Sequence, residues 1–147
     1  MGRNAVTYEE DYVAWTLEQA RLLRSGAFSE LDAENIAEEL DDMGRSIRRE
    51  LRSRFSILIM HLLKWRYQPG FRSRSWSSTI EEHRQQAKEL VEESPSLRPV
   101  VTREMSRAYE AARRKAAAET GFPESTFPAK CPFTADQVLA EDFLPEG

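Results

Sequence analysis

An uninterrupted stripe of apolar residues through the middle of this chain constrains its fold more than any other feature. The residues of the stripe are Ile36, Leu40, Met43, Ile47, Leu51, Phe55, Leu58, Leu62 and Trp65. Every step is three or four positions, which keeps one face of an α-helix apolar. The pattern predicts a helix from Asp32 to the Gln68-Pro69-Gly70 turn, about 36 residues and about 54 Å long. A compact chain of 147 residues has a radius of gyration of only about 15 Å, so this helix must span the body or extend beyond it.

Gly44 is the one position where this long helix could break. A glycine inside a helix costs about 1 kcal/mol relative to alanine. The apolar spacing nevertheless passes through Gly44 unchanged, and Asp41 and Asp42 precede Arg45 by four and three positions. That spacing lets both acids pair with the arginine across the glycine on a continuous helix. The sequence therefore favours continuity, with a break as the alternative.

The same periodicity, together with capping residues, predicts four other helices. They run from Thr7, in a capping box with Glu10, to Gly26, from Ser75 or Ser78 to just before Pro95, from Ser96 to Gly121, and over a few residues after Thr134. The segment after Phe122 is too rich in aromatic residues to be disordered. We expect an all-α fold over residues 1–147 as a single domain: an antiparallel bundle of four main helices with one long central helix and an aromatic C-terminal tail packed on it.

Charge is divided into blocks along the predicted long helix. Residues 1–44 carry 3 basic and 11 acidic side chains, whereas residues 45–74 carry 9 basic side chains and 1 acidic one. The net charge of −4 for the whole chain hides this division. It gives no general attraction to nucleic acid or to an anionic membrane, so any such attraction must be local. A helix with an acidic half and a basic half needs partners for both, inside the fold or outside it.

Several features predict a cytoplasmic protein without a membrane segment. Cys131 is the single cysteine, which excludes an intramolecular disulfide and suits a reducing compartment. The first five residues have no apolar core and do not predict a signal peptide. The longest apolar run, Ile57 to Met60, is far shorter than the roughly 20 residues that a membrane span requires.

Several blocks of residues, taken together, carry a resemblance to a known family. They are Tyr8-Glu9-Glu10-Asp11-Tyr12-Val13-Ala14-Trp15, Leu31-Asp32-Ala33-Glu34-Asn35-Ile36-Ala37-Glu38-Glu39-Leu40, His61-Leu62-Leu63-Lys64-Trp65, Ser75-Trp76, Ser94-Pro95-Ser96-Leu97, Cys131-Pro132-Phe133 and Asp142-Phe143-Leu144-Pro145. In combination they resemble the bacterial domain-of-unknown-function family number 29. The resemblance covers nearly the whole chain and implies a single-domain, all-helical bacterial protein. It implies no activity and no catalytic residues.

The basic block is the main candidate for binding. Its members are Arg45, Arg48, Arg49, Arg52, Arg54, Lys64, Arg66, Arg72 and Arg74, with Trp65, Tyr67, Phe71 and Trp76 among the later ones. Three alternatives stay open. The arginines pair with acids of a neighbouring helix, such as Glu81 and Glu89, or bind an acidic partner, or contact phosphates while the aromatics stack on bases. Pairing inside the fold is favoured for the block as a whole. The stretch from Lys64 to Trp76 holds no acidic residue and is the candidate binding region: Lys64, Trp65, Arg66, Tyr67, Arg72, Arg74 and Trp76.

Two histidines and an acidic cluster suggest a different chemistry. Glu34, Glu38 and Asp42 are spaced by four and share a helix face, which suits a divalent cation. His61 and His83 could act as a general base or as metal ligands, and they would approach each other if their helices are antiparallel neighbours. Neither histidine follows a glutamate by three positions, so the di-iron signature of helical bundles is absent. A solvated acidic face and structural histidines are therefore favoured, and no metal or cofactor is predicted.

The sequence thus predicts a non-enzymatic protein-binding or adaptor module that uses residues 64–76. A nucleic-acid-binding protein that uses the arginines of residues 45–74 is the first alternative. A small enzyme or metal-binding bundle that uses His61, His83 and the carboxylates of the long helix is the second. The long apolar stripe also leaves a homodimer open, because an unpartnered apolar face needs covering.

Overall fold

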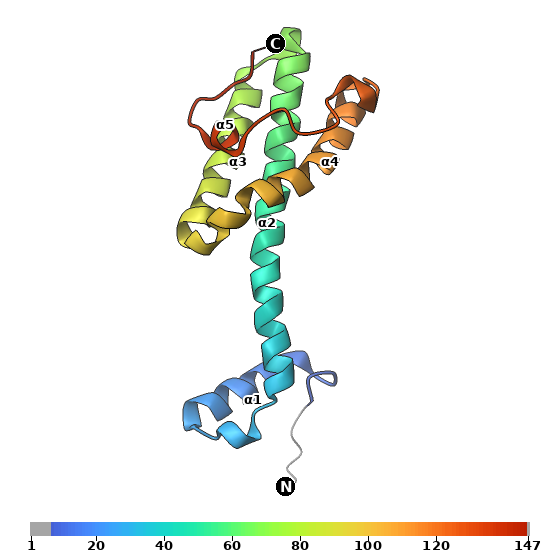
Figure 1. Ribbon diagram of the computed structural model, residues 1–147. Helices are drawn as coiled ribbons and strands as arrows, with labels where there is room; N and C mark the ends of the chain where they lie inside the picture. The colour runs from blue at the N-terminus through green and yellow to red at the C-terminus, as the bar shows by residue number, and fades with distance from the viewer. Residues whose placement is uncertain (1–6, 147) are drawn as a thin grey trace. The chain divides into compact units, whose positions relative to one another are not determined.

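The computed structural model describes residues 7–146, where all regular structure is helical (Figure 1). The α-helices are α1 (Tyr12–Ser25), α2 (Ala33–Tyr67), α3 (Arg74–Glu93), α4 (Val101–Thr120) and α5 (Ala135–Leu139). Four short 3₁₀ segments, η1 (Phe28–Glu30), η2 (Pro69–Phe71), η3 (Pro95–Val100) and η4 (Glu124–Thr126), lie in the connections. The predicted all-α class, with four main helices of which one is long, is confirmed.

Helix α2 is continuous through Gly44, as the apolar spacing and the charges around the glycine predict. It has 35 residues, and Pro69 follows soon after its end. The Arg45 guanidinium pairs with Asp42 across the glycine and lies 4.0 Å from the Glu38 carboxylate. These contacts between neighbouring turns support the helix where its glycine would weaken it.

The beginnings of two helices differ from the predictions. Thr7 and Glu10 exchange the two hydrogen bonds of a capping box, each at 3.2 Å, but these bonds close a single turn. Helix α1 begins later, because Asp11 is extended and its carboxylate accepts from the Ala14 N–H. Helix α3 is capped by Ser73, not by Ser75 or Ser78. The sequence prediction was therefore right about the helices and wrong about which polar side chain begins them.

The predicted start of α4 at Ser96 was also early. The segment from Pro95 to Val100 forms the 3₁₀ turns of η3, and α4 follows from Val101. Two prolines, Pro95 and Pro99, remove backbone donors from this stretch. The predicted ends are confirmed, since Gly26 and Gly121 both have the left-handed conformation, at φ of 78° and 79°.

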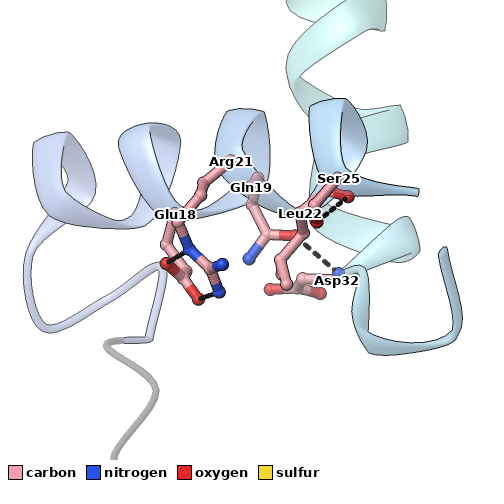
Figure 2. A network of polar contacts seen from close by, with 6 residues as sticks. All are labelled: Glu18, Gln19, Arg21, Leu22, Ser25 and Asp32. Atoms are coloured by element: carbon pink, nitrogen blue, oxygen red, sulfur yellow. Dashed lines mark hydrogen bonds and ion pairs between the residues drawn. The ribbon is translucent and has the colours of Figure 1, made fainter. Parts of the chain in front are cut away.

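Contacts within the chain cluster into two units that divide at Arg45 and Ser46. The first contains α1, η1 and the beginning of α2. Its buried side chains within residues 7–45 are Trp15, Gln19 and Leu22. Polar contacts join its two helices: the Trp15 indole N–H donates to Asp32 at 2.9 Å, and the Asp32 backbone N–H donates to the Gln19 side chain at 2.8 Å. Figure 2 shows the Gln19 contact reaching across from α1 to the start of α2.

The same unit holds a cluster of three aromatic rings. The Tyr8 ring packs edge-on against Trp15, with centroids 4.9 Å apart, and against Tyr12. Both tyrosine hydroxyls donate to the Glu39 carboxylate on α2. The hydrogen bond to Glu39 raises the pKa of Tyr8 to about 12. One carboxylate thus connects the aromatic cluster to the long helix.

The second unit contains the main apolar core. In this unit, the second half of α2 lies beside α3 and α4, and the C-terminal tail, drawn in red, runs across these helices (Figure 1). Leu51, Phe55, Leu58 and Leu62 of the stripe are fully buried there. Phe127, Phe133 and Val138 of the tail complete the core, so the predicted packing of the aromatic tail is confirmed.

One buried arginine holds the tail in place. The Arg84 side chain, on α3, is only 2% exposed. Its guanidinium donates to the backbone carbonyls of Val138 at 2.8 Å and of Phe143 at 2.7 Å, and to the Glu81 carboxylate at 2.8 Å. A planar group with five donors can serve all three acceptors at once. Arg84 therefore acts as a clamp between α3 and the end of the chain.

Two predictions concern a signal peptide and a membrane-spanning segment. The expected lack of a signal peptide rests on residues 1–5, which lie outside the described residues. Within residues 7–146, no helix combines the length and the apolarity that crossing a membrane requires.

Candidate binding surface at the turn between α2 and α3

The candidate binding region surrounds the turn that joins α2 to α3. Helix α2 ends at Tyr67, η2 turns the chain, and the Ser73 hydroxyl caps α3 by accepting from the Trp76 N–H at 3.1 Å. All seven predicted site residues lie on this turn or in the adjoining helical turns. The structure divides them into supporting residues inside the fold and exposed residues outside it.

Lys64 is a supporting residue. It is 8% exposed, and its ammonium donates to the Glu119 carboxylate on α4 at 2.7 Å. The same ammonium lies 4.6 Å from the ring centroid of Trp76 on α3, in cation–π geometry. Lys64 therefore joins three helices, and its charge is already satisfied within the fold.

The predicted aromatics are half-buried. Trp65 and Tyr67 pack against the apolar core, and the Tyr67 ring meets Phe127 edge-on at 5.0 Å between centroids. Trp76 is half-buried beneath Lys64. Tyr67 and Trp76 thus support the turn, whereas Trp65 is also in contact with an exposed arginine.

That arginine is Arg72, which is held over the Trp65 ring. Its guanidinium carbon lies 5.2 Å from the ring centroid, and its Nε–H donates to the Trp65 carbonyl at 2.8 Å. The side chain is thereby ordered before anything binds, while the remaining donors still face solvent. Ordering of this kind reduces the entropy lost on binding.

Phe71 is the most exposed aromatic of the turn, at 68%. The sequence prediction counts Phe71 among the aromatics of the basic block but leaves it out of the binding region. A signal was present, because a phenylalanine between a Pro-Gly turn and an arginine has no helical face on which to be buried. Arg74 is exposed beside it at the first position of α3, and Arg66 lies half-buried against the Tyr67 ring.

The basic block is only partly neutralised inside the chain. Arg45, Arg52, Arg54 and Lys64 form ion pairs with Asp42, Glu104, Glu50 and Glu119, respectively. Within residues 7–146, five others have no ion pair: Arg48, Arg49, Arg66, Arg72 and Arg74. The expected pairing with the acids of α3 was wrong, because the partners come from α4 and from α2 itself.

A pocket of about 360 Å³ adjoins the turn. It lies between the first turns of α3 and the tail, and its lining is Arg74, Ser77, Ser78, Glu81, Arg84, Asp142 and Leu144. Two arginines and two acids leave it without one dominant charge. The donors of Arg84 are already engaged with the tail, so Arg74 is the side chain that links this pocket to the turn.

The two histidines differ in their surroundings. His83 on α3 has a lowered pKa, chiefly because of burial and also because of the nearby charges of Arg54 and His61. The His61 Nδ1 lies 3.0 Å from the Ile57 carbonyl, an acceptor, so this nitrogen carries the proton. The His83 Nδ1 is buried and has no hydrogen-bond partner among residues 7–146.

Residues 7–146 contain neither a cluster of metal ligands nor an activated thiol. In residues 7–146, no group of three or more histidine, cysteine or acidic side chains is placed to hold a metal ion. Burial raises the pKa of the Cys131 thiol, which opposes formation of the nucleophilic thiolate.

Comparison with known families decides the relationship that the sequence suggests. The model of the family described as "Domain of unknown function DUF29" matches residues 7–144. The chain belongs to the DUF29 family. The match extends from the Thr7 turn to the tail segment held by Arg84, so the DUF29 domain includes both units. No curated protein and no solved structure matches the chain significantly.

Proposed function

We propose that this protein is a non-enzymatic binding module that captures an acidic, partly apolar segment of another protein. The contact is made by the turn surface, which we define as Trp65, Arg66, Phe71, Arg72 and Arg74. The observation that carries the proposal is Phe71, an aromatic side chain exposed at 68% among arginines that have no acidic partner in residues 7–146.

The phenylalanine and the arginines of the turn surface have separate roles. Burying a phenylalanine against a partner is worth about 2 kcal/mol, which makes Phe71 the apolar anchor. The arginines select for acidic residues around that anchor, and Arg72 is already ordered over Trp65. An aromatic anchor beside arginines is the composition typical of energetically dominant interface positions. Lys64, Tyr67 and Trp76 belong to the site as its support.

The test is a titration of the ¹⁵N-labelled protein with a synthetic amphipathic peptide of alternating acidic residues and leucines. We expect chemical-shift changes concentrated in residues 65–76. The double variant R72E/R74E should abolish them, and F71A should weaken binding about thirtyfold, the equivalent of about 2 kcal/mol.

A matched control separates specific binding from general charge attraction. Arg103 and Arg107 are two exposed arginines on α4, so R103E/R107E makes the same change in net charge elsewhere. It should leave the peptide affinity within about twofold at physiological salt, where exposed charges are screened beyond roughly 8 Å. Equal losses in both double variants, or no shifts in residues 65–76, would refute the proposal.

A nucleic-acid ligand is the second candidate, because Arg48 and Arg49 are exposed without an ion pair in the described part of the chain. Binding of that kind is supported by phosphate contacts and falls steeply with salt. Retardation of labelled single-stranded RNA or DNA, lost at high salt and in R48E/R49E, would favour it. Absence of retardation at low salt would exclude it.

A further inference from the structure

Helix α4 crosses the second half of α2 at an ion pair between the two helices. The Arg52 Nε–H donates to the Glu104 carboxylate at 2.8 Å, and Glu104 is only 3% exposed. A second contact lies farther along both helices, where the Lys115 ammonium donates to the Ser56 hydroxyl at 3.3 Å. All four residues belong to the second unit, so these contacts hold α4 against α2 (Figure 1).

Two exposed arginines of α2 lie beside this crossing. Arg48 and Arg49 precede Arg52 by four and three positions, and both are exposed. At 3.6 residues per turn they lie about one turn before Arg52 and within about 60° of it around the helix. Their side chains therefore leave α2 on the side where α4 crosses it.

Two exposed arginines of α4 lie on its uncovered flank. The other flank holds Tyr109, which is buried and donates to the Pro128 carbonyl of the tail at 2.6 Å. Arg107 precedes Tyr109 by two positions, about 200° around the helix, and Arg103 precedes Arg107 by about one turn. Both arginines are exposed, on the side of α4 away from the tail.

We propose that these four arginines bind the phosphate backbone of a nucleic-acid duplex without reading its sequence. The crossing surface is the name that we give to Arg48, Arg49, Arg103 and Arg107. The proposal rests on the nucleic-acid candidate named above. It extends the surface of that candidate from α2 to α4 and specifies a double-stranded ligand.

The charge of the crossing surface is not neutralised within the chain. None of its four arginines forms an ion pair in residues 7–146. The α4 acids Glu104 and Glu110 are already paired with Arg52 and Arg114. The second unit carries 17 basic and 14 acidic side chains, so the net negative charge of the chain comes from the first unit. A local positive field suits a polyanion.

The kinds of side chain that the crossing surface lacks point to a duplex. A protein partner is held mainly by apolar anchors, and no large apolar side chain is exposed on α4, every residue of which the structure describes. Ile47 of α2 is 37% exposed but lies about 140° from Arg52 around the helix. Single strands are held by bases stacked on aromatic rings, whereas Phe55 and Tyr109 beside the crossing are buried. Arginines alone suit a continuous phosphate backbone.

The crossing surface thus differs in chemistry from the turn surface, where Phe71 is an exposed aromatic anchor. An acidic peptide that carries leucines finds no such anchor on the crossing surface. For this reason R103E/R107E remains a suitable control for peptide binding at the turn surface, although the same residues take part in the binding proposed here.

The expected binding depends strongly on salt. Each phosphate neutralised on a duplex changes the slope of the logarithm of the association constant against the logarithm of salt concentration by about −0.9. Four arginines therefore predict a slope of about −3.6. Raising the salt from about 50 to about 200 mM should weaken binding about a hundredfold.

Fluorescence anisotropy of a labelled duplex of about 20 base pairs, measured over a salt series, tests the proposal. R103Q/R107Q should weaken binding at low salt by at least about tenfold and reduce the steepness of the slope by about 1.8. R24Q/K130Q removes the same charge at two exposed cations, one on α1 and one in the tail, and should leave the slope unchanged. Duplexes of unrelated sequence should bind alike, and the single strand of equal length more weakly. Circular dichroism should show unchanged helix content in each variant.

The possible failures can be told apart. Absence of binding by any nucleic acid at low salt would overturn this proposal together with the nucleic-acid candidate. Weaker binding in R48Q/R49Q but not in R103Q/R107Q would overturn this proposal and leave that candidate standing, as would tighter binding of the single strand. Binding of vesicles that contain anionic phospholipid, by a protein that binds no duplex, would assign the crossing surface to a membrane. The peptide titration of the turn surface measures a different ligand and is independent of all these results.

Discussion

Lys64 illustrates how a cation in a predicted binding region can belong to the fold instead. Its ammonium contacts Glu119 on α4 and the ring of Trp76 on α3. A free surface lysine would keep its hydration and its rotamer freedom, whereas this one has exchanged both for two defined contacts. Arg72, eight positions later, has kept its solvent-facing donors.

This difference predicts opposite outcomes for substitution. K64M should lower the free energy of unfolding by about 1–2 kcal/mol, since it removes an ion pair and a cation–π contact. A double-mutant cycle with E119Q in urea unfolding should give a coupling of roughly 1 kcal/mol, reduced by the exposure of Glu119. K130M, at an exposed lysine, is the control and should stay within about 0.5 kcal/mol. A stable K64M that loses peptide binding would instead place Lys64 on the turn surface.

At the scale of elements, Gly26 and Gly44 have different structural roles. Gly26 ends α1 in the left-handed conformation, at φ of 78°. Gly44 lies inside α2 with open space around the position of a Cβ. Only the first needs glycine for the backbone, because a side chain is strained at positive φ.

We therefore expect the two glycine-to-alanine substitutions to have opposite signs. G44A should raise the free energy of unfolding by about 1 kcal/mol through helix propensity. G26A should lower it by about 1 kcal/mol through strain at the helix end. Chemical unfolding followed by circular dichroism measures both changes. Destabilisation by G44A would show that α2 is not a regular helix at this position.

The elements themselves could largely be predicted from sequence, for reasons visible in particular residues. The spacing from Ile36 to Trp65 determined α2, and Gly121 marked the end of α4. The caps were missed because Ser73, Ser75 and Ser78 are chemically alike and close together, and only the three-dimensional turn selects one of them. Arg84 was missed because a charged residue is expected at the surface. Its position four after Ile80 and three before Ala87 does place it on the buried face.

The site was harder to predict than the helices. Charge composition identified residues 64–76, but it could not separate Lys64, which faces α4, from Arg72 and Arg74, which face solvent. That distinction depends on which neighbouring helix supplies an acid. Sequence reasoning chose α3, whereas the acids came from α4 and α2.

At the scale of the whole molecule, the two units have very different cores. Within residues 7–45 the buried apolar side chains are Trp15 and Leu22 alone, supported by the hydrogen bonds to Asp32 and Glu39. The second unit has the large cluster around Leu58 and Phe127. Local stability follows the number of buried apolar contacts.

Hydrogen exchange should show this difference directly. We expect amides of residues 12–40 to exchange faster than those of residues 51–65, because the smaller core opens at a lower free energy. Peptide-resolved mass spectrometry measures both ranges in one experiment. Equal protection in the two ranges would show that they open together and would support the single cooperative domain that the sequence predicts.

The exposed charges on α2 also bear on how relatives of this chain diverge. Arg48 and Arg49 make no ion pair within residues 7–146, so a mutation there has little effect on folding and is not removed by selection for stability. Whatever selection acts on these two positions must come from the molecule that the helix meets. Substitutions at positions 48 and 49 among relatives would then be an evolutionary record of that encounter, in residues on which the fold does not depend.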